Sequence, residues 1–303
     1  MRIGLFLGDL VFRSTDDVIA GIKRADSEGF ASAFLPQVFG WDSLTLLAVA
    51  GREAANIELG TAVVPTYPRH PVALAGQAAT VNSLTGGRLA LGIGVSHAPV
   101  IEGSLGYSFE RPAHHMKEYL SALLPLMRGE AAKVDGDTVK VNAKLGNPPT
   151  APPQVLLAAL APHMLGLAGS VADGTITWMV GPKVLKSHTA PRINAAAEKA
   201  GRDAAPRVVV GVPVCVTDDA AAARERAAKT FAMYGTLPVY RSQLDAEGYA
   251  GPGDAAVVGN EEQVTEALEA CLAAGGTELI ATLFGGPDDK ERSRALLANL
   301  NRG

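Results

Sequence analysis

Few side chains in this 303-residue sequence have the types and spacing that catalysis needs, and most of these are neutral. Gln37 and Trp41 follow one short apolar run, and Ser96-His97 follows another. Pro162 follows a third run, at a place where its missing N–H suits the first turn of a helix. The two backbone amides after Pro162 are then free to bind an anion such as a phosphate.

The same segments lack the groups that several common chemistries require. Asp42 is their one carboxylate, and its position before a helical pattern favours an N-cap role. Hydrolysis by paired carboxylates, or a metal site of Asp, Glu and His, is therefore difficult to build. His114 and His115 lack further ligands nearby, so we predict no metal site. Neutral, small and aromatic residues suit a site in which a bulky planar cofactor performs the redox chemistry.

Composition excludes other classes of function. The 27 Lys and Arg residues against 31 Asp and Glu give a net charge of −4, which offers no footprint for nucleic acid. No apolar stretch approaches the roughly 18–20 residues of a membrane span. Cys215 and Cys271 are far apart, which predicts buried thiols in a reducing compartment. The run Ile3–Leu7, ended by Asp9, predicts a strand rather than a signal peptide. We therefore expect a cytoplasmic protein that acts on a small molecule.

Short apolar runs alternate with helical patterns along the whole chain. The runs that predict strands are Ile3–Leu7, Ala31–Leu35, Ile57–Val63, Leu89–Ile93, Val155–Ala159, Thr175–Trp178, Arg207–Val216 and Glu278–Leu283. Their nearly continuous apolar character is typical of parallel strands covered by helices. Because at least one helical pattern follows each run, we predict a (β/α)8 TIM barrel, with residues 1–303 as a single domain.

A doubly wound open sheet is the alternative architecture. It would normally place a glycine-rich phosphate turn after the first strand, whereas Gly8–Phe12 contains one glycine. Two gaps between predicted strands are long, over residues 94–154 and 217–277. We interpret them as insertions after strands 4 and 7 that could form a substrate pocket or a dimer interface. The first gap includes a predicted hairpin over Lys133–Val141.

Two segments carry a resemblance to a known family. Residues 59–71 (LGTAVVPTYPRHP) and 86–94 (GGRLALGIG) resemble the bacterial luciferase-like superfamily, and within it the branch that uses the deazaflavin coenzyme F420. The resemblance extends over nearly the whole chain and is strongest over residues 1–100 and 155–185. It implies an F420-dependent oxidoreductase that forms a homodimer, with FMN as the alternative cofactor.

The resemblance also implies which residues contact the cofactor. Members of the family have a non-prolyl cis peptide beneath the cofactor ring, which corresponds here to Ala62-Val63. The segment beside the ring corresponds to Gly94, Val95, Ser96 and His97. The segment that holds the phosphate-bearing tail corresponds to Ala159, Leu160, Ala161, Pro162, His163 and Met164. Many relatives have glycine where this chain has Ala161.

Two departures from the family bear on the reaction. Sugar-phosphate dehydrogenases of the branch use a histidine and a glutamate at the positions of Gln37 and Val95. Without that acid/base pair we expect a reductase, to which the cofactor supplies the hydride. Gln37, Trp41 and His97 are the candidate catalytic residues. The alternative role is a helix cap for Gln37, part of the pocket wall for Trp41 and a plain loop histidine for His97. The other candidate functions are an FMN-dependent luciferase-like monooxygenase and a non-catalytic flavin-binding protein.

Overall fold

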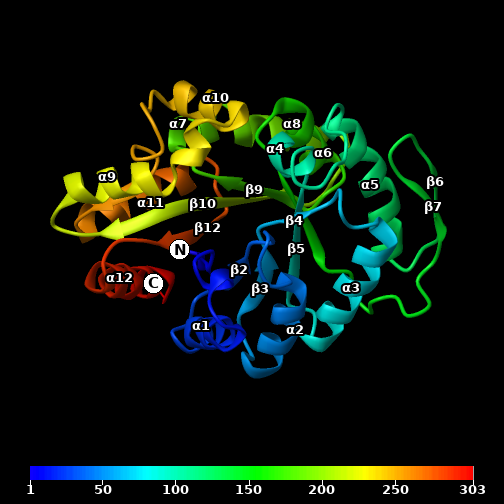
Figure 1. Cartoon of the computed structure of the whole chain (residues 1–303), viewed down its shortest axis with the longest axis horizontal. Coiled ribbons are helices and arrows are strands. Elements are labelled where there is room, and N and C mark those ends of the chain that lie inside the picture. Colours follow the sequence, from blue (N-terminus) through cyan, green and yellow to red (C-terminus); the bar gives the residue numbers. More distant parts are fainter. Residues whose placement is uncertain (303) are drawn as a thin grey trace.

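The computed structural model describes residues 1–302, apart from the side chain of Val11. Eight parallel strands form a closed ring, because the last strand pairs with the first. These strands are β1 (Ile3–Phe6), β2 (Ser32–Leu35), β3 (Glu58–Thr61), β5 (Leu89–Gly94), β8 (Gln154–Ala158), β9 (Gly174–Trp178), β10 (Arg207–Val216) and β12 (Glu278–Leu283). Helices surround this ring (Figure 1), so the predicted TIM barrel is confirmed.

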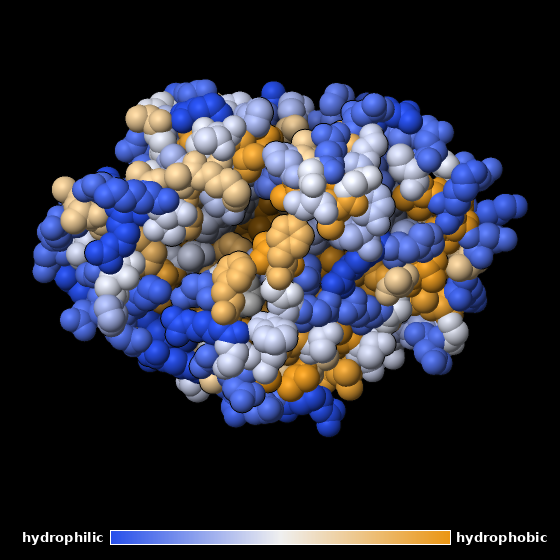
Figure 2. Space-filling view, in the orientation of Figure 1, coloured by the Kyte–Doolittle hydropathy of each residue, from blue (hydrophilic) through white to orange (hydrophobic). Residues whose placement is uncertain are grey.

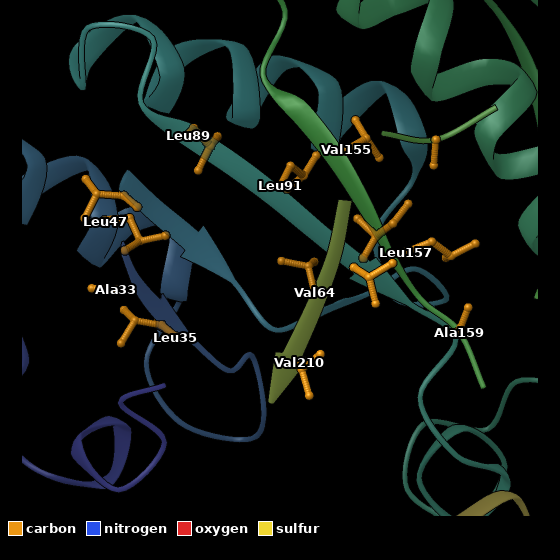
Figure 3. Packing of buried hydrophobic residues seen from close by; sticks show 14 of the residues in the cluster. Ala33, Leu35, Leu47, Val64, Leu89, Leu91, Val155, Leu157, Ala159 and Val210 are labelled. Atoms are coloured by element: carbon orange, nitrogen blue, oxygen red, sulfur yellow. The ribbon is translucent and has the colours of Figure 1, made fainter. Parts of the chain in front are cut away.

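Alternate residues of each strand face opposite sides of the barrel wall. Leu91, Val155 and Leu157 belong to the large cluster that packs against the helices, as Figure 3 shows. The neighbouring residues form a separate inner cluster, which consists of Phe34, Ala90, Leu156, Ile176, Val209 and Ile280. Gly60 makes room for the ring of Phe34, since a Cβ atom at Gly60 would lie 2.2 Å from it. The barrel interior is therefore filled with apolar side chains rather than open.

The covering helices begin where the sequence offers local signals. Ser14 and Asp17 form a reciprocal capping box, Asp42 accepts a hydrogen bond from the backbone N–H of Thr45, and His70 caps the next helix. The covering helices are α1 (Thr15–Ser27), α2 (Ser43–Glu53), α3 (Pro71–Leu84), α5 (Pro112–Met127), α6 (Pro162–Ser170), α8 (Ala190–Lys199), α11 (Glu261–Ala273) and α12 (Pro287–Arg302). The N-cap role expected of Asp42 is confirmed.

The two long gaps contain additional elements. The first holds α4 (Ala98–Ile101) and the antiparallel hairpin β6 (Ala132–Asp135) and β7 (Lys140–Ala143), close to its predicted position. The second holds α9 (Ala220–Thr230), a 3-10 turn (Ala232–Gly235), α10 (Pro238–Glu247) and β11 (Val257–Gly259). The sequence pattern over residues 184–200 predicts one continuous helix, whereas the structure has α7 (Pro182–Val184), a π-helical turn (Leu185–Thr189) and then α8.

The N-terminal end of the barrel is closed by an ionic cluster, which we define as Arg2, Glu58, Arg207 and Glu278. The Nε atom of Arg207 lies 2.7 Å from Glu278, and its Nη2 atom lies 2.7 Å from Glu58. Arg2 pairs with the same two carboxylates. Burial alone would lower the pKa of Arg207, but the two glutamates outweigh it and raise that pKa. All four charges are therefore partnered.

None of the described helices combines the length and the apolar character needed to span a membrane.

Candidate active site

The backbone interrupts its regular strand pairing between the end of β3 and the start of β4 (Val64–Pro65). The hydroxyl of Thr61 donates to the carbonyl oxygen of Gly92 and accepts from the N–H of Gly92, at 2.8 and 2.9 Å. These side-chain bonds take the place of backbone pairing at this point. The Ala62-Val63 peptide bond that follows is cis, as the resemblance implied. Both residues pack against the inner cluster, so they lie at the C-terminal end of the barrel interior.

A short strand, β4 (Val64–Pro65), then returns the chain to β5. Gly94 lies at the end of β5, where a Cβ atom would approach the side chain of Val63 to 2.8 Å and that of Ala158 to 3.2 Å. Three neighbouring strand ends therefore converge closely at one place, which we call the cradle and where only glycine fits. Ser96, two residues further on, has a positive φ of 61°. Such backbone is unfavourable for a residue with a side chain and is found preferentially at ligand sites.

Five aromatic rings also border this opening, and we define them as the aromatic wall: Phe6, Trp178, Tyr234, Tyr240 and His97. Phe6 on β1 and Trp178 on β9 meet with ring centroids 5.4 Å apart, which places both rings over the barrel interior. Tyr234 contacts Trp178 at 6.0 Å and Tyr240 at 4.9 Å. His97 then meets Tyr240 at 5.8 Å. Figure 2 shows a hollow lined with apolar residues near the centre of this face.

The wall is uncharged near neutral pH. Burial lowers the pKa of His97 and raises the pKa values of Tyr234 and Tyr240. All three shifts favour the neutral form of the side chain. The indole Nε1 of Trp178 is buried and has no hydrogen-bond partner within residues 1–302. The wall therefore offers aromatic faces and an unused N–H donor, but no formal charge.

Helix α10 is held in place over the barrel by a specific anchor. The carboxylate of Glu247 accepts a hydrogen bond of 2.6 Å from the backbone N–H of Val184 in α7, which follows β9. Gly248 ends α10 with a positive φ of 90°. The insertion over residues 217–277 thus contributes Tyr240 to the same opening as the strand ends. The sequence predicted that this insertion could form a substrate pocket or a dimer interface, and the structure places its Tyr240 next to His97.

Gln37 and Trp41 lie after β2, on the strand end next to the cradle. The side-chain oxygen of Gln37 accepts a hydrogen bond of 2.8 Å from the N–H of Ser43, so it caps α2. The indole of Trp41 donates to the carbonyl oxygen of Arg13 at 2.8 Å, and the side chain is 49% exposed. Gln37 therefore has the structural role that the sequence left open. Trp41 ties the loops after β1 and β2 together at the rim.

The expected tail-binding segment follows β8 and begins α6. Ala161 is the N-cap, and no side chain caps this helix. Pro162 occupies the first turn, so the amides of His163 and Met164 have no intrahelical partners. His163 is exposed, whereas Met164 is buried. The carbonyl oxygen of Leu160, just before this turn, is bonded to His188 Nε2 at 2.8 Å.

The expectation that His114 lacks further possible ligands nearby is wrong. Glu118 and Asp137 lie near His114, with carboxylate oxygens 2.9 and 3.3 Å from its Nε2 atom, because the hairpin folds back over α5. Glu118 is already committed to that hairpin, since it accepts hydrogen bonds from the N–H groups of residues 137, 138 and 139. We therefore interpret the three residues as a polar contact that fixes the hairpin.

Sequence reasoning missed the most distinctive residues of the opening. Trp178 ends a short strand and Tyr240 lies in an insertion without a motif, so neither stood out. The available signal was compositional. The chain has only two tryptophans and six tyrosines. Because these residues are rare in the sequence, a tryptophan at a predicted strand end is a candidate site residue.

The chain matches one family model and several curated proteins. The model of the luciferase-like monooxygenase family matches residues 8–278. A 5,10-methylenetetrahydromethanopterin reductase of Methanolobus tindarius is 31% identical over 213 residues, which span 68% of this chain but only 63% of that reductase. A Mycobacterium tuberculosis protein named as a coenzyme F420-dependent oxidoreductase is 27% identical over 279 residues, which cover 85% of this chain and 79% of that protein.

A solved structure has the same architecture. The coenzyme F420-dependent tetrahydromethanopterin reductase of Methanopyrus kandleri superposes with a TM-score of 0.83. The alignment covers 98% of this chain and 97% of the reductase, at 20% sequence identity. At this level of identity, the likeness establishes a shared fold.

Proposed function

Because the chain belongs to the luciferase-like monooxygenase family, we propose that it is a coenzyme F420-dependent oxidoreductase. Its substrate would be a small organic molecule bound at the C-terminal end of the barrel. The names of the reductase and oxidoreductase relatives support the choice of F420 within this family. The observation that carries the proposal is the cradle of Val63, Gly94 and Ala158 beside the cis peptide, where residue 94 has no room for a side chain.

The residues at this opening fit a deazaflavin. The uncharged cradle suits a planar ring, and the unpartnered amides at the start of α6 suit a phosphate. We propose that the ring lies against Ala62, Val63, Gly94, Val95, Ser96 and His97, with Gln37 at its edge. We propose that the tail lies along Ala159, Leu160, Ala161, His163 and Met164.

The direction of the reaction follows from the residues at two positions. Bound F420 supplies hydride chemistry. The Gln37 amide is committed to capping α2 and Val95 is aliphatic, so neither residue can serve as the base that an alcohol oxidation needs. We therefore propose that the enzyme works as a reductase. His97 and Trp41 remain the candidate catalytic residues, and Trp41 stands at the rim.

A binding titration tests this proposal. We expect F420 to bind to the purified protein more tightly than FMN, as followed by ligand fluorescence. Gly94→Val should weaken F420 binding about fivefold or more, because overpacking of about 1–3 kcal/mol corresponds to a factor of about 5 to 150. Gly76→Ala is the matched control, since a Cβ atom there meets nothing within 4 Å.

The outcomes separate the candidate functions. A preference for FMN with oxygen-dependent turnover would assign the protein to the flavin monooxygenases. Binding of F420 without turnover over a broad substrate panel would favour a non-catalytic binding protein. If neither cofactor bound, or if Gly94→Val bound F420 normally while remaining folded, the proposed cofactor site would be wrong.

A further inference from the structure

The aromatic wall has features that a cofactor cradle does not explain. Three of its five rings, Trp178, Tyr234 and Tyr240, come from β9 and from the insertion, whereas the cradle is built by β3, β5 and β8. We propose that this wall binds the second ligand of the site, an uncharged planar compound with a conjugated carbonyl group. In this arrangement the carbonyl oxygen accepts a hydrogen bond from the indole Nε1–H of Trp178. The inference rests on the proposed function and specifies its substrate class.

The donor is fixed in position and is unused. Trp178 makes edge-to-face contacts with Phe6 at 5.4 Å, Phe231 at 5.8 Å and Tyr234 at 6.0 Å, so its ring cannot turn freely. Its Nε1–H is buried without a partner in the described chain. An indole N–H can only donate, and leaving such a group unsatisfied is unfavourable. A ligand that brings an acceptor oxygen restores the missing bond.

The charge of the wall selects against ionic ligands. His97, Tyr234 and Tyr240 are neutral near pH 7, and Phe6 and Trp178 carry no charge. A carboxylate or phosphate bound against these five rings would leave water without a cation to compensate it, which is strongly unfavourable. Lys183, which follows β9 along the chain, is exposed to solvent. A neutral carbonyl oxygen accepts the same hydrogen bond without that penalty.

The shape of the wall favours a flat ligand. Five aromatic side chains meet in sequence from Phe6 to His97, with centroid separations between 4.9 and 6.0 Å. Aromatic faces and edges arranged in this way bind other aromatic or conjugated systems by stacking and edge contacts. The combination of one fixed donor and a neutral aromatic surface therefore indicates a conjugated ketone or aldehyde rather than a sugar or an amino acid.

Nitrogen-15 NMR of the indole groups tests this inference on the intact protein. The chain has two tryptophans, Trp41 and Trp178, so it gives two indole N–H signals, and Trp41→Phe identifies them. The probes are acetophenone, styrene and benzoate, which share a flat ring. Acetophenone has a neutral acceptor, styrene has no acceptor, and benzoate has a charged one. Each probe is titrated with and without saturating F420.

We expect acetophenone to shift the Trp178 indole signal and to bind about fivefold more tightly than styrene, which is the factor that one neutral hydrogen bond supplies. Benzoate should bind more weakly than either. In Trp178→Phe, the affinity for acetophenone should fall to that for styrene, while F420 binding is unchanged. Equal binding of benzoate, or a shift confined to Trp41, would overturn the inference.

The two proposals fail in different ways. If acetophenone shifts the Trp178 signal but F420 does not bind, the wall is a ligand site and the cofactor assignment is wrong. If F420 binds but no probe perturbs Trp178, the substrate class is wrong and the cofactor assignment stands. If Trp178→Phe weakens F420 binding instead, Trp178 contacts the cofactor and the wall has been assigned to the wrong ligand.

Discussion

The two ends of the barrel differ in whether their polar groups have partners within the protein. At the N-terminal end, the four charges of the ionic cluster are paired, and Glu278 is only 2% exposed. At the C-terminal end, the wall is uncharged, the indole N–H of Trp178 has no partner, and Ser96 and Met179 have positive φ angles. Both ends are built by the same eight strands, so the difference comes from the side chains and loops.

This contrast separates stability from function. A buried charge that loses its partner costs several kcal/mol, so the ionic cluster secures the closure of the ring. A buried donor without a protein partner costs free energy unless a water molecule or a ligand supplies the acceptor. Substitutions at the two ends should therefore have different consequences, and the following predictions test that difference.

The largest loss of stability is expected at the ionic cluster. Arg207→Met leaves Glu58 and Glu278 with Arg2 as their remaining partner in the cluster. We expect the free energy of unfolding to fall by about 3 kcal/mol, as measured by urea denaturation. Arg128→Met is the control, because it breaks an exposed pair with Glu130 and should cost about 0–1 kcal/mol. A loss at Arg207 no greater than at the control would contradict a stabilising role for the cluster.

A smaller and pH-dependent effect is expected at Glu118, on the helix that carries the hairpin. Burial alone would raise the pKa of Glu118, but hydrogen bonds from Thr138 and from backbone N–H groups outweigh it and lower the pKa to about 2. A folded-state pKa below the unfolded value stabilises the protein above about pH 4.3, and this contribution is lost as the pH falls towards 2.

Glu118→Gln should therefore cost about 1–2 kcal/mol at pH 7 and almost nothing near pH 2. Thermal or urea unfolding across this pH range measures the difference between the variant and the wild type. Glu130→Gln is a suitable control, since that carboxylate is on the surface. A cost at Glu118 that did not change with pH would mean that the carboxylate charge is not what holds the hairpin.

The smallest change in stability is expected at the unpartnered indole. Trp178→Phe keeps an aromatic ring at the opening and removes an N–H that is bonded to no other group of the described chain. We expect the free energy of unfolding to change by less than about 1 kcal/mol. Trp41→Phe is the matched comparison, because its N–H is bonded to the Arg13 carbonyl oxygen. A loss above 2 kcal/mol at Trp178 would show that the indole is structural.

Local signals in the sequence predicted most of the fold correctly. The capping residues Ser14, Asp42 and His70 act within a few positions of themselves, so each helix start could be inferred without knowing the tertiary structure. The eight strands were found because each is apolar on both faces. The split of the helix after β9 was missed, since the π-helical turn over Leu185–Thr189 has no comparable local signal.

The site was predicted unevenly. The cis peptide at Ala62-Val63 lies where the resemblance to the family placed it, and not where any local physical rule did. The helix cap that the sequence left open for Gln37 is present, since its amide oxygen accepts from the N–H of Ser43, while its contact with the cofactor stays a prediction. The contact of His114 with Asp137 was not foreseen, because a hairpin brings together residues that are 23 positions apart.

The sequence by itself determined the succession of strands and helices, the closed barrel that eight such units form, and the family. These properties depend on apolar periodicity and on capping, which act over short distances along the chain. Only the tertiary structure decided which aromatic residues face the opening. Trp178 and Tyr240 belong to one wall because Glu247 anchors α10 to α7, and Gly94 leaves a cradle because three separate strands converge on it. Such long-range contacts depend on the packing of the whole chain, and no short segment of sequence encodes them.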